Sequence, residues 1–268
     1  MPYCDSHAHL ADPRFDADRA EVLARAAEAG VTRVVTCGAD LATSAAEADL
    51  VAWAARRGTS PALYAAVGIH AHEARSAVGP GGALDEGAFQ RLVALAGRPG
   101  VVALGEIGLD YHYTFSPPEV QRAVLGRQLE IARDLGLPVI LHNRESDADL
   151  VAQIEAGPAG LSGVLHCFLG DRRLAEWALA RGLYLGVAGP ITFRNPGALP
   201  DVLRSVPLDR LLVETDSPYL APHPYRGRRN EPAHVVRVAE GLAEVLGLPP
   251  ERVAEETAAN ARRLFGIP

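Results

Sequence analysis

The sequence predicts an α/β fold, namely a (β/α)8 TIM barrel with an additional C-terminal helix. Short runs rich in β-branched residues alternate with longer Ala-, Arg-, Glu- and Leu-rich stretches along the 268 residues. This alternation is typical of a parallel sheet covered by helices. The sequence contains no low-complexity stretch or long linker, so we expect one domain over residues 1–268. A GxGxxG motif, which would favour an open dinucleotide-binding sheet, does not follow the first strand.

Eight runs have the length and composition of buried strands. Their expected ranges are residues 3–9, 33–37, 63–70, 101–107, 138–142, 163–168, 183–187 and 211–216. Helical patterns that end near turn glycines lie between them, including residues 19–29, 45–57, 121–135 and 174–181. A last helical pattern at residues 250–265 follows the eighth strand, and we expect this helix to pack outside the barrel.

The charge and the cysteine pattern exclude several classes of protein. The formal net charge is -7, so the molecule lacks the overall positive field that drives tight non-specific binding to nucleic acid. All 26 basic residues are arginine, which excludes a Schiff-base lysine, a P-loop lysine and a carbamylated lysine between metals. Cys4, Cys37 and Cys167 are an odd set without a CxxC pair, so we expect neither a disulfide framework nor a zinc ribbon.

The N-terminal residues enter a strand pattern directly, without the basic and apolar regions of a signal peptide. The sequence also lacks an apolar run of 18 residues. We therefore predict a cytoplasmic protein without membrane association, and we expect a monomer without a protein partner.

Side chains that bind metals lie near the C-terminal ends of the predicted strands. His7 and His9 are two residues apart in DSHAH, so strand alternation points both to one face and Cys4 toward the helices. The same alternation points Cys167 away from His166 and toward the helices, which excludes it as a nucleophile or ligand. Six strands each end near one candidate: His9, His70, Glu106, His142, His166 and Asp216. In a barrel these ends form one mouth, where active sites are built.

The residue types at this mouth predict the chemistry. A core histidine is the ordinary explanation for any one of them, but their recurrence on separate strands indicates a shared metal site. Imidazoles and carboxylates suit Zn or Mn, and also Mg where water completes its shell. We expect two divalent metal ions as cofactors, Mg, Mn or Zn. Two ions about 3.5–4 Å apart need an acidic bridge, and Glu106 is the natural one because the chain has no lysine.

Seven motifs occur in order along the chain: DSHAH, GIHAHE, GEIGLDYH, LHNRES, HCFLGD, ETDSPYL and RRNEP. Together they resemble the TatD-type metal-dependent deoxyribonucleases of the amidohydrolase superfamily, and the resemblance extends from Met1 to the C-terminal NARRLFGIP. Two positions depart from the family pattern: Ala71 stands where proline is usual, and Leu169 where a small polar residue is usual. Neither departure removes a candidate ligand.

The resemblance implies particular roles for these residues. His7, His9, Glu106 and Asp216 would hold one ion, while Glu106, His142 and His166 would hold the other. Asp216 would also be the general base, so Asp216 and Glu106 are the expected catalytic residues. The family hydrolyses DNA, often from a 3′ end. We therefore expect a metal-activated water to cleave phosphodiester bonds of DNA, a transient substrate entering by single-stranded or frayed 3′ ends.

The alternative is an amide or ester hydrolase with the same metal site, for example one that cleaves aminoacyl esters. The wider superfamily hydrolyses such bonds, and membership of a fold does not fix the substrate. A metal-binding or interaction module without turnover is a third possibility, which the complete ligand set and the acid Asp216 disfavour.

Four further residues are expected to support the site. The resemblance suggests a phosphate contact or a supporting role for His70, with a structural histidine as the alternative. Arg144 and Arg228 lie near the predicted mouth, where a guanidinium can bind phosphate oxygens in a bidentate manner. Glu214 should point inward one layer below Asp216, either to orient a ligand histidine or to pair with Arg144.

Overall fold

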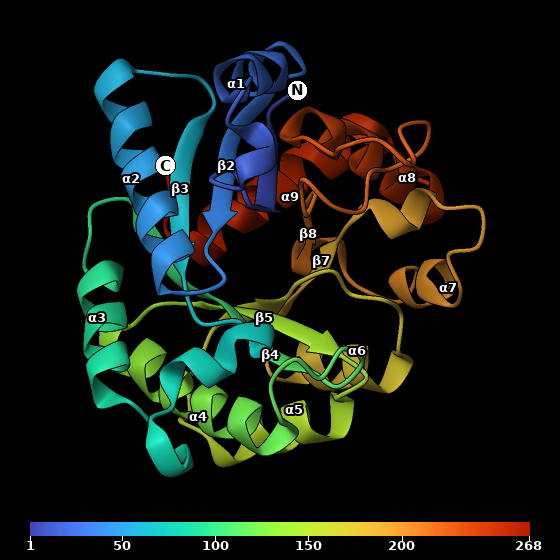
Figure 1. The fold of residues 1–268 in the computed structure, drawn as a ribbon. Helices are drawn as coiled ribbons and strands as arrows, with labels where there is room; N and C mark the ends of the chain where they lie inside the picture. Colours follow the sequence, from blue (N-terminus) through green and yellow to red (C-terminus); the bar gives the residue numbers. More distant parts are fainter.

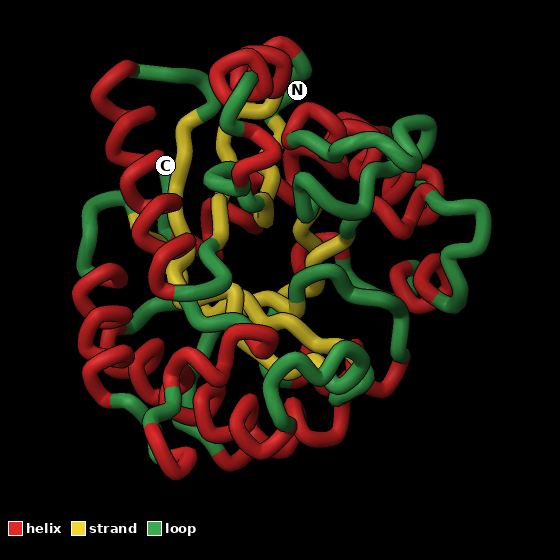
Figure 2. Tube along the Cα trace, viewed as in Figure 1, coloured by secondary structure: helices red, strands yellow, loops and turns green.

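The computed structural model describes residues 1–268 apart from the side chain of residue 80. Within this part of the chain, eight strands form one parallel sheet in the order β1 to β8. They ring the centre of the molecule, with helices outside them (Figures 1 and 2). The strands are β1 (Tyr3–Ala8), β2 (Val31–Cys37), β3 (Ala62–Val67), β4 (Val101–Asp110), β5 (Val139–Arg144), β6 (Gly163–Leu165), β7 (Tyr184–Val187) and β8 (Leu211–Val213). The predicted barrel fold is confirmed.

The α-helices follow the strands in alternation. They are α1 (Arg19–Glu28), α2 (Leu41–Arg57), α3 (Glu86–Ala96), α4 (Pro118–Leu135), α5 (Asp147–Ala156), α6 (Arg172–Ala180), α7 (Leu199–Leu203), α8 (Val235–Leu246) and α9 (Pro250–Phe265). Left-handed glycines end four of them, at Gly58, Gly136, Gly247 and Gly266. Glycine adopts this conformation without the steric penalty that a Cβ atom brings.

Several strands are shorter than the sequence predicted. β6 and β8 have three residues each, so His166 and Asp216 follow their strands instead of ending them. Their amides are nevertheless held by neighbouring strands, because His166 N donates to the Leu141 carbonyl at 3.0 Å and Asp216 N to the His7 carbonyl at 2.9 Å. The sheet thus positions these residues although they lie outside its regular ladder.

The barrel closes between β8 and β1 at the mouth. Ala8 forms a parallel bridge with Ser217, and His9 N donates to the Ser217 carbonyl at 2.7 Å. Together with the bond from Asp216 N to His7, these contacts join the residues that flank the predicted metal ligands. The hydrogen bonds that close the barrel therefore also set the spacing of the site.

The barrel interior contains small and branched side chains from every strand, and α9 covers its far end. The interior cluster comprises Cys4, Val35, Cys37, Ala66, Ala103, Ile140, Val164, Tyr184 and Leu212, joined by Leu264, Phe265 and Ile267. Asn260 Nδ2 fixes the helix by donating to the carbonyls of Leu208 at 2.9 Å and Leu211 at 2.8 Å. In Figure 1, α9 passes in red behind the strands. This helix is therefore a plug for the end opposite the mouth.

Simple alternation is wrong for the first strand. Cys4, expected to face the helices, lies in the interior cluster, and Tyr3 packs in the outer core. The register of β1 against β2 shifts between Asp5 and Ala8, and this irregularity returns His7 to the interior side.

The fourth strand behaves in the same way. Ala103 is part of the interior cluster, whereas Leu104, expected to share the face of Glu106, packs in the outer core. The register of β4 against β5 shifts between Leu104 and Ile107. This shift directs the Glu106 side chain into the mouth.

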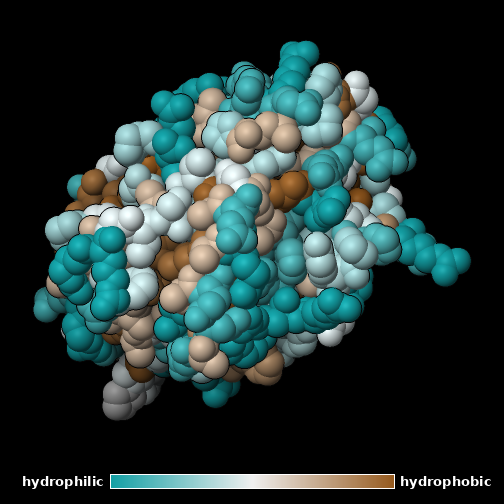
Figure 3. Space-filling model, turned by 90° about the horizontal axis from the view of Figure 1, so that it is seen from above, coloured by the Kyte–Doolittle hydropathy of each residue, from teal (hydrophilic) through white to brown (hydrophobic). Residues whose placement is uncertain are grey.

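The face of the molecule seen in Figure 3 is mostly hydrophilic. Polar residues predominate on it, and apolar patches are small and scattered. Among the described residues, no helix is both long and apolar enough to cross a membrane.

Candidate active site

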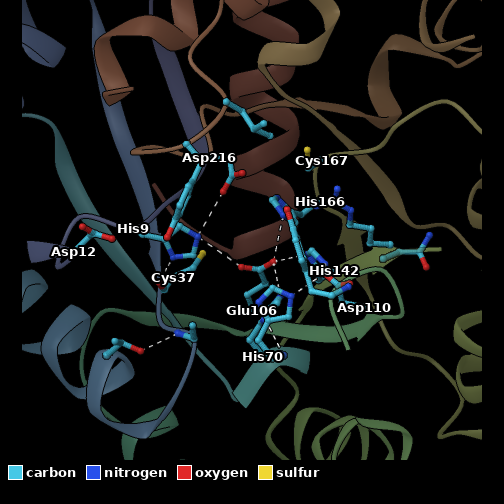
Figure 4. A pocket seen from close by; sticks show the side chains of 18 of the residues that line it. His9, Asp12, Cys37, His70, Glu106, Asp110, His142, His166, Cys167 and Asp216 are labelled. Atoms are coloured by element: carbon cyan, nitrogen blue, oxygen red, sulfur yellow. Dashed lines mark hydrogen bonds and ion pairs between the residues drawn. The ribbon is translucent and has the colours of Figure 1, made fainter. Parts of the chain in front are cut away.

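A pocket of about 590 Å³ lies at the C-terminal ends of the strands. Its lining includes residues that follow or end separate strands, namely His9, His70, Glu106, His142, His166 and Asp216. The structure thus brings together the side chains that the sequence predicted to meet, and Figure 4 shows Glu106 between His9 on one side and His70, His142 and His166 on the other.

Glu106 is the centre of this arrangement. Its Oε2 lies 3.4 Å from His7 Nε2 and 3.6 Å from His9 Nε2. Its Oε1 lies 2.9 Å from His142 Nδ1, and 3.3 Å from both His166 Nε2 and His70 Nε2. Burial alone would raise the pKa of Glu106, but the neighbouring imidazoles of His70 and His166 and the hydrogen bond with His142 hold that pKa well below its usual value. The side chain is therefore a carboxylate that contacts both halves of the site.

His7, His9 and Asp216 converge beside this carboxylate. The two Nε2 atoms are only 3.2 Å apart, and Asp216 Oδ1 lies 3.7 Å from His7 Nε2 and 3.5 Å from His9 Nε2. Burial alone would lower the pKa of His9, but the hydrogen bond with Asp216 and the charge of Glu106 raise it to about 9. Burial alone would raise the pKa of Asp216, whereas the hydrogen bond with His9 and the charges of His166 and His7 lower it.

The outward ring nitrogens of two histidines have acceptors as partners. His9 Nδ1 lies 2.7 Å from the Cys37 carbonyl, and His166 Nδ1 lies 2.9 Å from Glu214 Oε1. A carbonyl or carboxylate oxygen only accepts, so both Nδ1 atoms donate. The lone pair of each neutral ring is then on the Nε2 atom that faces the site, an arrangement typical of metal-bound histidine. Of the two roles considered for Glu214, the contacts show orientation of His166.

The donor atoms fit divalent cations. Three groups offer nitrogen and oxygen atoms within 4.8 Å of one another: His7, His9 and Asp216; His7, Glu106 and His166; and His70, Glu106 and His142. Closely facing Nε2 atoms between carboxylates have no better common partner than a cation, and the donor set suits Zn, Mn or Mg. Glu106 belongs to two of the groups, as expected for a bridging ligand.

The sequence model of the family described as "TatD related DNase" matches residues 4–266 of the chain. The chain belongs to this TatD family. An uncharacterized metal-dependent hydrolase, YabD of Bacillus subtilis strain 168, is 38% identical over 264 residues, 98% of each chain. A protein named 3′-5′ ssDNA/RNA exonuclease TatD from Cronobacter sakazakii is 39% identical over 268 residues, 97% of each chain.

Solved structures agree with this assignment. The crystal structure of YJJV, a TatD homolog from Escherichia coli K12, superimposes with a TM-score of 0.87 at 30% identity, over 99% of this chain and 98% of that one. The predicted family resemblance is confirmed, and the chain is a hydrolytic enzyme of the TatD family.

The structure adds a residue to the site that the sequence analysis missed, namely Asp110, which contacts His142. His142 Nε2 lies 3.2 Å from Asp110 Oδ2, and His142 Nδ1 points to Glu106. Asp110 is fully buried and also lies 2.7 Å from His72 Nε2. Burial alone would raise the pKa of Asp110, but the hydrogen bonds from His142, Tyr113 and His72 lower it. The available signal was the position of Asp110 in GEIGLDYH, four residues after Glu106.

His70 differs from the other histidines around Glu106. Its Nδ1 accepts a hydrogen bond from His72 N at 3.1 Å, so the proton of the neutral ring is on Nε2 and points toward Glu106. Burial lowers the pKa of His70 to about 4, which keeps the ring neutral. His70 is therefore a hydrogen-bond donor in the pocket, consistent with its predicted place in substrate binding.

The structure separates the two predicted substrate-binding arginines. Arg144 lines the pocket, and its guanidinium carbon lies 4.6 Å from the centre of the Tyr113 ring. Arg228 is exposed on the segment after β8 and is absent from the pocket lining within the described part of the chain. A phosphate contact therefore has geometric support for Arg144, while for Arg228 it stays a prediction.

The expected orientation of Cys167 is wrong. Cys167 lines the pocket, because β6 has already ended at Leu165 and Cys167 has a positive φ of 46°. Strand alternation does not extend through such a turn. Burial raises the pKa of its thiol above the ordinary value, so the thiolate that a nucleophile or metal ligand needs is disfavoured.

Two buried acids outside the predicted set support the site. Asp5 accepts hydrogen bonds from Thr215 N at 2.8 Å and Thr215 Oγ1 at 2.6 Å, which fixes the residue before Asp216; burial raises the pKa of Asp5 to about 8. Glu47 accepts from Ala11 N at 2.9 Å and Thr36 Oγ1 at 2.6 Å, which attaches α2 to the segment after His9.

Proposed function

We propose that this TatD-family hydrolase cleaves phosphodiester bonds of single-stranded or frayed DNA from the 3′ end, with two divalent metal ions. The observation that carries the proposal is the Glu106 carboxylate, which is shared between two groups of nitrogen and oxygen donors in one open pocket. Relatives that are 36% and 39% identical are named 3′-5′ ssDNA/RNA exonucleases, which supports a nucleic-acid substrate.

The site residues divide into ligands and groups that face the substrate. His7, His9, Glu106 and Asp216 would hold one ion, and Glu106, His142 and His166 the other. When bound, such ions supply positive charge that activates water and neutralises phosphoryl oxygens.

Three side chains would act on the reacting groups. Asp216, kept ionised by its histidine neighbours, accepts the proton of the attacking water. The Nε2–H of His70 and the guanidinium of Arg144 donate hydrogen bonds to phosphoryl oxygens, whose negative charge increases toward the transition state.

The test is digestion of a 5′-labelled single-stranded oligonucleotide, with a chromogenic carboxyl ester assayed on the same preparation. We expect stepwise shortening that excess chelator abolishes and that added Mn, Mg or Zn restores. Full activity after prolonged dialysis against chelator would contradict the metal requirement. Inertness toward all DNA beside rapid ester hydrolysis would replace the proposal with the ester-hydrolase alternative.

A further inference from the structure

Exposed aromatic side chains of this molecule gather at the mouth of the pocket. Within the described residues they are Tyr113, Phe115 and Tyr219, with 47%, 61% and 48% of their surfaces exposed. Tyr113 and Tyr219 line the pocket that contains Glu106, and Phe115 packs against Tyr113. The other Phe, Tyr and Trp side chains among the described residues are buried or half-buried. Large aromatic rings that are exposed at a functional opening indicate a surface that binds planar groups.

Tyr113 and Phe115 form one continuous stack. Their rings are parallel, with an interplanar angle of 2° and centroids 5.5 Å apart. The His72 ring abuts both of them edge-on, at 5.6 Å and 87° to Tyr113 and at 4.9 Å and 89° to Phe115. Because Asp110 holds His72 Nε2 at 2.7 Å, this support is itself fixed to the end of β4.

The segment that carries the two rings is pinned at both ends. Asp110 Oδ1 accepts hydrogen bonds from the backbone N–H groups of His112 and Tyr113, each at 2.9 Å. At the other end, the buried Ser116 donates from Oγ to the His72 carbonyl at 2.9 Å. Rings that are exposed yet held in place lose little conformational entropy on binding, which favours affinity.

The stack lies next to the metal-binding cluster. The His72 ring centroid is 6.1 Å from that of His142, and the Nε2 atoms of both rings contact Asp110 Oδ2, at 2.7 Å and 3.2 Å. Arg144, the pocket arginine, lies over the Tyr113 ring at 4.6 Å. A strand whose phosphate is at the cluster would thus bring a neighbouring nucleobase to the aromatic stack.

We propose that the Tyr113–Phe115 stack binds a nucleobase beside the scissile phosphate of the substrate strand. This inference rests on the proposed function and adds a mode of substrate recognition, namely stacking on a nucleobase. Stacking does not depend on which base is present, since every base has a π-face. A phosphodiester without bases would use the metal cluster but forgo this contact.

The test compares two oligothymidylates that differ only in their bases: one is complete, and the other is abasic at its two 3′-terminal nucleotides. The readout is the ratio of kcat/KM for the complete strand to that for the abasic strand. Because both values come from one preparation, the ratio is independent of the fraction of folded, metal-loaded enzyme. Tyr113→Ala combined with Phe115→Ala removes the stack, whereas Tyr113→Phe combined with Phe115→Tyr keeps both rings. Leu135→Ala removes a comparably exposed side chain at the far end of α4 and serves as the matched control.

We expect the wild-type ratio to be about tenfold or more, as base–aromatic stacking elsewhere indicates. The double alanine variant should bring the ratio close to one, while the ring-keeping variant and Leu135→Ala retain the wild-type value. A wild-type enzyme that digests both strands equally well, or a double alanine variant with an unchanged ratio, overturns the stacking proposal alone. If the wild type digests neither strand, the proposed function fails and the stacking proposal fails with it.

Discussion

Four of the histidines around Glu106, namely His9, His70, His142 and His166, are fixed by the group on their outward nitrogen. The Cys37 carbonyl, Glu214 and Asp110 are acceptors beside His9, His166 and His142, so those rings direct a lone pair into the site when neutral. His70 instead receives a backbone N–H on its Nδ1. One carboxylate is therefore surrounded by histidines of two kinds, candidate metal ligands and a hydrogen-bond donor.

This distinction predicts different outcomes for two histidine variants. His70→Ala should lower kcat by about 10²–10³, as loss of one donor to a developing negative charge does, with metal content near that of the wild type. His166→Ala should lose metal and activity together. Metal content measured by atomic emission after gel filtration, alongside kcat, separates the two cases. Loss of metal in His70→Ala in step with its activity would show that His70 is a ligand.

The two acids of the site should also differ. Asp216→Asn keeps one coordinating oxygen but removes the proton acceptor, so the rate should fall by about 10²-fold or more with a smaller loss of metal. Glu106→Ala removes the shared ligand, so metal content and rate should fall together. Metal content and kcat, measured in parallel on each variant, test both expectations. Near-normal turnover by Asp216→Asn would refute the assignment of Asp216 as the base.

Glu47 predicts how stability depends on pH. Burial raises its pKa from 4.5 to about 7, so the folded state binds this proton more tightly than the unfolded state does. The protonated Glu47 side chain therefore makes its full contribution to the stability of the folded state below pH 4.5, and this contribution is lost as the pH rises to about 7. In metal-free protein, Glu47→Gln should remove this loss, and its stability relative to wild type should increase by roughly 2–3 kcal/mol between pH 5 and pH 8.

Urea unfolding at the two pH values, in the presence of chelator, measures this difference. Glu28→Gln, a substitution at an exposed position on α1, is the control and should leave the pH dependence unchanged. The prediction is refuted if Glu47→Gln follows the wild-type curve at both pH values.

At the scale of elements, the order of the strands and the residue types at their ends were predictable. Each site residue follows an apolar run, and parallel strands in a barrel share one mouth, so His9, Glu106 and Asp216 could be expected to meet. The direction of individual side chains was not predictable, because the register of β1 changes between Asp5 and Ala8 and that of β4 between Leu104 and Ile107. Cys167 was misplaced for a related reason, since β6 ends before it.

The helix α9 illustrates the same limit. Its amphipathic pattern predicted a helix at residues 250–265, which is confirmed, but a helix pattern alone does not say which surface receives the apolar face. Leu264, Phe265 and Ile267 join the barrel interior, so α9 supplies core residues to the same cluster as the small interior side chains Ala66 and Ala103.

The plug predicts a large effect on stability far from the chemistry. Phe265→Ala should lower the free energy of unfolding by about 3–5 kcal/mol, as truncation of a buried Phe usually does. Because the plug lies at the end opposite the mouth, kcat of the folded enzyme should change little. Urea unfolding gives the first value and kinetics at low temperature the second, with the exposed Leu135→Ala as a control that should stay within about 0.5 kcal/mol of wild type. A Phe265→Ala protein as stable as wild type would show that α9 does not seal the barrel.

At the scale of the whole molecule, charge and shape restrict the form of the substrate. The net charge of -7 provides no overall attraction for a polyanion. Under the proposed function, attraction for DNA would have to come from the metal ions and from a few arginines such as Arg144. The cluster lies within a concave pocket at one end of the barrel. A chain terminus can enter such a pocket, whereas the middle of a stiff duplex cannot.

These constraints lead to the prediction that digestion starts at a 3′ terminus and proceeds one nucleotide at a time. A 5′-labelled single strand should give a descending ladder on a denaturing gel, while a covalently closed circle of the same sequence should resist. Because few phosphates are neutralised, kcat/KM should decrease only modestly between about 50 and 200 mM salt, unlike that of proteins with extended basic tracks. Rapid cutting of the circle would reveal endonucleolytic action, and a 3′-phosphoryl or otherwise blocked terminus that is digested as fast as a free one would show that the enzyme does not recognise the strand end.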